Sequence, residues 1–204
     1  YMPYERLEQD VKMMKKAGIN VVRIAESTWS TCEPQEGVFD FSHVERVLDA
    51  MEAAGIQVII GTPTYAIPSW MEKSYPDILA ETKKGRGIYG PRQIMDITHP
   101  VYLFYAERVI RRLMEVTAKR KCVIGFQIDN ETKYYGTAGN NVQRGFVKYI
   151  RSLFHDDLDA FNHAFGLDYW SNRINAWEDF PDVRGTINGS LGAEFEKFQR
   201  TLVD

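Results

Sequence analysis

Short apolar segments alternate with amphipathic segments of helical length along most of this chain, and this alternation restricts the fold more than any other feature. The apolar segments are residues 19–24 (INVVRI), 56–60 (IQVII) and 122–128 (CVIGFQI). Their length and β-branched content are typical of buried parallel strands. Each follows a segment with apolar residues at helical spacing, namely residues 5–17, 42–54 and 102–116. The pattern predicts a parallel α/β sheet, either closed as an eight-stranded barrel or open and doubly wound.

The remainder of the chain predicts further helices around a less regular stretch. Residues 142–153 and 191–202 have helical periodicity, whereas residues 155–187 are irregular and rich in Trp, Asp and Asn. At the start of the helix predicted after residue 41, Ser42 and Glu45 have the spacing of a capping box. The 204 residues and 44% apolar content suit one domain over residues 1–204, in which 155–204 is an irregular insert followed by a helix.

Composition excludes several classes of protein. The net charge of −3, with both signs interspersed, does not indicate a nucleic-acid partner. No apolar run approaches the roughly 18–20 residues that span a bilayer, so no membrane association is expected. The two cysteines, Cys32 and Cys122, are too few and too distant for a disulfide framework or a zinc cluster, and we interpret both as reduced packing residues.

Chemically informative residues follow each predicted strand. In parallel barrels the chemistry lies in the loops after the carboxyl ends of the strands, which here are residues 25–29 (AESTW), 61–65 (GTPTY) and 129–131 (DNE). Glu131 at such a position can act as a general acid, and Asn130 can hydrogen-bond a sugar hydroxyl. Alternatively, Glu131 is a surface charge at the start of a helix and Asn130 a turn former.

Further side chains suited to sugar binding occur near these loops. Aromatic faces stack on pyranose rings and fixed donors bind hydroxyl groups; the candidates are Trp29, Tyr65, Trp70, Arg92, Tyr134 and Tyr135. The two tryptophans are equally compatible with core packing, and Arg92 with a solvated ion pair. Glu26 is either a substrate ligand or the partner of Arg23 or Arg92.

Taken together, four sequence blocks resemble glycoside hydrolase family 42. They are residues 22–29 (VRIAESTW), 37–41 (GVFDF), 61–70 (GTPTYAIPSW) and 125–131 (GFQIDNE), in the family's order and spacing. The resemblance implies a (β/α)8 TIM barrel, retaining hydrolysis and β-galactosidase activity on β-galactosides or galacto-oligosaccharides. It also implies that Glu131 is the acid/base, that Asn130 is a sugar ligand, and that Arg92 matches the family's site arginine.

The same resemblance places this chain within a longer barrel. The family's Asn-Glu pair follows the fourth strand, whereas Glu131 follows the third predicted strand here. We therefore expect the first strand to precede Tyr1, the nucleophilic Glu after the seventh strand to follow Asp204, and this chain to hold strands two to four. A barrel truncated at both ends is expected to be inactive by itself.

The resemblance carries further expectations about cofactors and assembly. No cofactor is required. Some family members bind zinc through cysteines, but Asp96 stands where one of those cysteines would fall, so no metal is expected. A homo-oligomer, a trimer in the family, and a cytoplasmic location are implied. Two alternatives remain: another barrel glycosidase, such as a β-glucosidase, β-mannanase or arabinosidase type, and a non-catalytic sugar-binding half-barrel.

Overall fold

The computed structural model describes residues 4–132, 134 and 136–203, which form two compact units. The sheet unit comprises residues up to 78, 88–95 and 100–132, and the helical unit comprises 79–87, 96–99 and the described part of 133–204. The chain passes between the units more than once, so neither is a continuous segment. The expectation of one domain over residues 1–204 stays a prediction.

The sheet unit is built on three parallel strands, β1 (Val21–Ile24), β2 (Gln57–Gly61) and β5 (Val123–Gln127), in the order β1-β2-β5. Val22 pairs with Val58 and Ile60 with Phe126, and the register between β2 and β5 shifts after Val58. The three predicted strands and their parallel arrangement are confirmed. Consecutive parallel strands joined through helices are the arrangement of a (β/α)8 barrel, of which this unit is a part.

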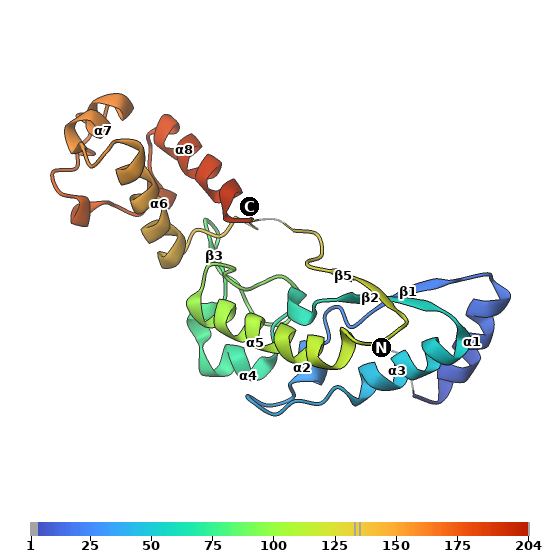
Figure 1. Cartoon of the computed structure of the whole chain (residues 1–204). Helices are drawn as coiled ribbons and strands as arrows, with labels where there is room; N and C mark the ends of the chain where they lie inside the picture. The colour runs from blue at the N-terminus through green and yellow to red at the C-terminus, as the bar shows by residue number, and fades with distance from the viewer. Residues whose placement is uncertain (1–3, 133, 135, 204) are drawn as a thin grey trace. The chain divides into compact units, whose positions relative to one another are not determined.

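Three helices cover one face of this sheet (Figure 1). They are α1 (Leu7–Lys16), which follows the 3-10 turn η1 (Tyr4–Arg6), α3 (Ser42–Ala54) and α5 (Pro100–Thr117). Their apolar stripes pack with the strand residues in one core that includes Leu48, Ile60 and Leu113. Burial of these stripes removes apolar surface from water and is the main source of stability of the sheet unit.

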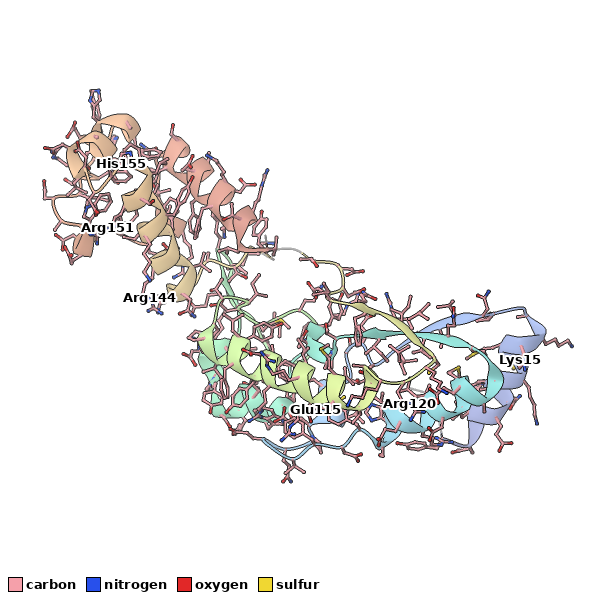
Figure 2. The ribbon with its side chains drawn as sticks, in the orientation of Figure 1. Lys15, Glu115, Arg120, Arg144, Arg151 and His155 are labelled. Carbon is pink, nitrogen blue, oxygen red and sulfur yellow. The ribbon has the colours of Figure 1, made fainter. Side chains whose placement is uncertain are left out.

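The helix ends are fixed by local chemistry. Gly55 adopts a left-handed conformation (φ 69°) as the C-cap of α3. The predicted capping box at the start of α3 is wrong, because Ser42 is already helical and its N–H donates instead to Asp40 Oδ1 at 2.9 Å. At the far end of α5, Arg120 bonds Asp49 and Glu52 of α3 and ties the two helices together (Figure 2).

Short elements follow the strands and line the connecting loops of the sheet unit. Helix α2 (Trp29–Cys32) comes after β1, and η2 (Pro63–Tyr65) and α4 (Ser69–Ser74) come after β2. The turn η3 (Pro76–Ile78) ends the second of these connections. None of these short elements has enough length for helical periodicity to reveal it in the sequence.

The helical unit contains the hairpin of β3 (Glu81–Thr82) and β4 (Gly85–Arg86) and three helices. The helices are α6 (Asn140–Leu153), α7 (Leu158–Phe165) and α8 (Gly189–Arg200); shorter 3-10 turns are η4 (Trp177–Asp179), η5 (Val183–Gly185) and η6 (Thr201–Val203). A core rich in phenylalanine, centred on Phe146, Phe161 and Phe195, holds the helices together.

One expectation for the helical unit is wrong. Residues 155–187 were expected to be irregular, but α7 lies within them. The Asp157 carboxylate accepts the N–H of Ala160 and caps this helix, and Gly166 (φ 60°) ends it. Within the described part of the chain, no helix has the length and apolar character needed to cross a membrane.

Candidate active site

The carboxyl ends of β1, β2 and β5 meet at one edge of the sheet, because the three strands are parallel and adjacent. The loop after β5 carries Asn130 and Glu131, and the loop after β2 lies beside it: Thr62 donates its hydroxyl to the carbonyl of Ile128 at 2.5 Å. The predicted gathering of the loops at one edge is therefore present in the structure, in agreement with the rule for parallel sheets.

Glu131 lies between a phenol and a guanidinium group. Tyr65 donates its hydroxyl to Glu131 Oε2 at 2.8 Å, and Arg92 Nη2 lies 3.7 Å from the same oxygen. The Arg92 guanidinium also lies over the Tyr65 ring, 5.3 Å from its centroid. The Glu131 side chain is 50% exposed, so solvent reaches the carboxylate. Three residues that are distant in the sequence thus form one cluster.

Gln93 holds the backbone of this cluster, and no motif or periodicity predicted this role. Its side-chain Nε2 donates to the carbonyls of Asn130 at 3.2 Å and Glu131 at 3.5 Å, and its backbone N–H donates to Tyr65 O at 3.1 Å. Both Gln93 (φ 57°) and Glu131 (φ 49°) are left-handed, a conformation that costs energy in residues other than glycine. Such strain persists where surrounding contacts enforce it, and it often marks functional sites.

A second group of polar residues lies beside Asn130. Arg23 Nη2 forms an ion pair with Glu26 at 2.7 Å, and Arg23 Nη1 donates to Gln127 Oε1 at 2.5 Å. Gln127 Nε2 in turn donates to Asn130 Oδ1 at 3.3 Å. Of the two roles left open for Glu26, the structure shows the one as partner of Arg23. A signal for Arg23 and Gln127 was present: each is the one polar side chain of an otherwise apolar strand.

Gly61 allows Glu26 to approach the sheet closely. A Cβ atom at position 61 would lie 2.9 Å from the Glu26 Cβ and 3.3 Å from its Cα, which is shorter than van der Waals contact permits. The loop after β1 also contains the left-handed residues Ala25 (φ 73°) and Ser27 (φ 59°). Glu26 therefore lies against the end of β2, in a loop whose backbone conformation is constrained.

Tyr65 is buried, and its hydroxyl group contacts the candidate acid, Glu131. Its side chain is 3% exposed, and burial together with the hydrogen bond to Glu131 raises the pKa of its phenol above the usual value. A phenol is protonated at neutral pH, and the Tyr65 hydroxyl donates a hydrogen bond to the Glu131 carboxylate. The structure thus shows Tyr65 in contact with the candidate acid.

The expectation that Trp29 lines the substrate site is wrong, because its ring has no exposed surface. Its indole N–H donates to Glu33 Oε2 at 3.1 Å within the interior. Trp70 donates its indole N–H to the Glu33 carbonyl at 2.9 Å and packs edge-on against Tyr105. These are the contacts of packing residues, and they connect α2 and α4 to α5.

Three further expectations concern aromatic residues and metals. Tyr134 belongs to the helical unit and hydrogen-bonds Arg200, and Tyr135 lies outside the described residues. Asp96 is buried and accepts hydrogen bonds from Thr98 and Asn141. Among residues 4–132, 134 and 136–203, no three His, Cys, Asp or Glu side chains are grouped as metal ligands. Cys32 and Cys122 are both buried and free.

Fold and site together define part of an α/β barrel with a carboxyl group beside an arginine at the carboxyl edge of its sheet. The model of glycoside hydrolase family 42, described as beta-galactosidase, matches residues 1–203. The chain belongs to this family.

Named relatives and solved structures agree with this membership. A beta-galactosidase of Thermus thermophilus is 31% identical over 183 residues, covering 88% of this chain and 28% of the relative. Beta-galactosidase BbgII of Bifidobacterium bifidum is 30% identical over 187 residues, covering 89% and 26%. The structure of a beta-galactosidase from the haloarchaeon Halorubrum lacusprofundi superposes with a TM-score of 0.88 at 28% identity, covering 99% of this chain and 31% of that one.

A second solved structure, the beta-galactosidase of Rahnella sp. R3, gives a TM-score of 0.87 at 29% identity and covers 98% of this chain. This chain spans 30% of that structure's chain, and only between a quarter and a third of the curated relatives' lengths. The relatives are therefore much longer than this chain, and most of their length has no counterpart in it.

Proposed function

We propose that the protein containing this chain is a retaining glycoside hydrolase that cleaves terminal β-D-galactosyl residues, with Glu131 as its acid/base. The position of Glu131 carries the proposal: its carboxyl group follows the third parallel strand, contacts Tyr65 and Arg92, and is half exposed. Support comes from membership of family 42 and from relatives named beta-galactosidases.

In the proposed reaction Glu131 donates its proton to the glycosidic oxygen as that bond breaks. A second carboxylate, from a part of the protein outside this chain, attacks the anomeric carbon and forms a glycosyl-enzyme ester. Glu131 then removes a proton from the water that hydrolyses the ester, so the configuration is retained. In retaining enzymes the two carboxyl groups are about 5–5.5 Å apart. Neither step requires a cofactor.

The neighbours of Glu131 have separate parts in this proposal. Asn130 binds a hydroxyl of the galactosyl ring, since hydrogen bonds at the 2-hydroxyl strengthen in the transition state. Arg92 is 65% exposed and extends into solvent beside Glu131, so it is placed to bind a second hydroxyl. Tyr65 holds the acid through its hydroxyl. The nucleophile lies elsewhere, so the isolated chain is expected to be inactive.

The acid/base role is tested by Glu131→Gln in the full-length protein, assayed with two aryl β-galactosides. With a poor leaving group, which needs protonation, kcat/KM should fall by about 10²–10⁴-fold. With a dinitrophenyl leaving group, which departs without protonation, it should fall much less, and azide should give the β-galactosyl azide. Glu107→Gln, an exposed carboxylate on α5, is the matched control and should change neither rate.

Two results would contradict the proposal. Equal loss on both leaving groups would show that Glu131 does not act as an acid, and an α-configured first product would exclude retention.

A panel of aryl β-glycosides on the wild-type protein tests the sugar: preference for a glucoside, mannoside or arabinoside would assign another barrel glycosidase. Saturable sugar binding without hydrolysis of any of them would assign a non-catalytic binding protein.

A further inference from the structure

A chain of hydrogen bonds crosses the carboxyl edge of the sheet and ends at Asn130, the residue before Glu131. It begins with Glu26 and Arg23, which form an ion pair at 2.7 Å. Arg23 Nη1 donates to Gln127 Oε1 at 2.5 Å, and Gln127 Nε2 is 3.3 Å from Asn130 Oδ1. These residues come from β1, the loop after it, and the end of β5 with its loop.

Tyr65 lies beside the end of this chain, where its hydroxyl donates to Glu131 Oε2 at 2.8 Å. The Asn130 amide presents its oxygen to Gln127. Its nitrogen is therefore on the side away from Gln127.

The hydrogen bonds of this chain run in one direction, with each donor on the Arg23 side and each acceptor on the Asn130 side, because Arg23 can only donate. A guanidinium group has donors and no acceptor, and it cannot lose its proton in a protein. Arg23 therefore fixes the Gln127 oxygen toward itself, and the Gln127 nitrogen donates to the Asp129 carbonyl at 2.9 Å and to Asn130 Oδ1 at 3.3 Å. Side-chain amides at an ordinary site can rotate by half a turn with little cost, but here each amide is oriented by the one before it.

We propose that Gln127 is a positioning residue for the glycosidase reaction, in which it binds the Asn130 amide oxygen and so leaves the amide nitrogen for the substrate. This inference rests on the proposed function. The amide nitrogen of asparagine is a donor, so in this orientation it can donate to a sugar hydroxyl.

Gln127→Glu in the full-length enzyme tests this inference. Glutamate still accepts from Arg23, but its second oxygen faces Asn130 Oδ1, so the Asn130 amide should turn over and present its oxygen to the sugar. We expect kcat/KM for an aryl β-galactoside to fall about 10–100-fold, the range typical of residues that orient a ligand. Gln57→Glu is the matched control, since Gln57 is exposed at the opposite end of β2.

The decisive measurement compares an aryl β-galactoside with its 2-deoxy analogue. In the wild type the analogue should react much more slowly, because it lacks the hydroxyl that Asn130 binds. In Gln127→Glu this ratio should shrink by about the same factor as kcat/KM falls, whereas a merely structural defect would slow both substrates equally. If Gln127→Glu does not fold, Gln127→Met, which removes the polarity at similar size, should shrink the ratio by a smaller factor.

The two proposals fail in different ways. An unchanged ratio in folded Gln127→Glu or Gln127→Met, with an active wild type and an inactive Glu131→Gln, overturns the inference alone. A wild type that hydrolyses no aryl β-galactoside overturns the proposed function, and this inference with it.

Discussion

Two of the glutamate–arginine pairs of the sheet unit, Glu33–Arg108 and Glu131–Arg92, lie in contrasting environments. Glu33 is fully buried and pairs with Arg108, whose side chain is 26% exposed, while Glu131 is 50% exposed and pairs with Arg92, which is 65% exposed. Glu33 also accepts the N–H of Gly37 at 2.8 Å and the indole N–H of Trp29. Glu131 accepts the Tyr65 hydroxyl and lies farther from its arginine. The same two residue types thus build a structural pair and a candidate reactive pair.

This difference indicates that burial determines whether a glutamate–arginine pair stabilises the fold or is accessible to a ligand. A buried carboxylate with donors on both oxygens has no access to a substrate, and removal of its charge leaves the arginine uncompensated. An exposed pair is screened by solvent and adds little to stability, but its carboxyl group can exchange a proton and contact a ligand. The buried structural pair and the candidate reactive pair therefore involve different glutamates of one unit.

The largest expected effect on stability comes from Glu33→Gln in the full-length protein. The amide keeps an acceptor for Trp29 or Gly37, but Arg108 loses its counter-charge, so the free energy of unfolding should fall by about 3 kcal/mol. Urea unfolding followed by tryptophan fluorescence measures this. Glu107→Gln on the same helix, whose pair with Arg111 is exposed, should cost only about 0–0.5 kcal/mol. Equal losses in the two variants would refute the comparison.

A smaller effect is expected from the thiol beside Glu33. Burial raises the pKa of Cys32 from 9.0 to about 11. Between these values the unfolded chain releases the thiol proton and the folded chain keeps it, so stability falls as pH rises. Cys32→Ala lacks this loss. Its stability relative to the wild type should improve by up to about 2–3 kcal/mol between pH 8 and pH 11. Parallel stability curves for the two proteins would show that the thiol is not protected by burial.

The smallest effect is expected at the exposed pair. Arg92→Gln should change the free energy of unfolding by less than about 0.5 kcal/mol, because a solvent-screened ion pair contributes little. The difference in free energy of unfolding between this variant and Glu33→Gln then measures how much more the buried pair contributes to stability than the exposed pair. A loss above about 2 kcal/mol, or a stability difference that depends strongly on salt, would mean that Arg92 supports the fold and would weaken its assignment to substrate binding.

Much of the fold was predictable because it depends on local pattern. The strands around Val22, Ile60 and Phe126 are short, apolar and β-branched or aromatic, and the helices between them have clear apolar stripes. Helix α7 was missed because it is only eight residues long and a second aspartate, Asp156, stands next to its cap at Asp157. The capping box failed because Asp40 competes for the same N–H.

The candidate site was predictable in part, by position and by family motif. Glu131 and Asn130 were predicted because they directly follow a strand, and Arg92 because it matches the site arginine of the family that the chain resembles. Gln127 stands out as the one polar side chain of its strand but was not predicted to have a role, and nothing near Gln93 in the sequence marks it. The importance of both glutamines comes from what they contact. Trp29 was misassigned because a tryptophan in a loop motif looks the same whether its ring faces solvent or Glu33.

By itself the sequence determined the order of helices and strands, their parallel arrangement and the family, since these follow from periodicity and from contiguous motifs. Only the tertiary structure decided which glutamate is buried and which is exposed, and which amide faces which neighbour. Those properties arise between residues up to about a hundred positions apart, such as Arg23 and Gln127. Burial and hydrogen-bond direction belong to the folded arrangement, because the unfolded chain leaves all of these groups in water.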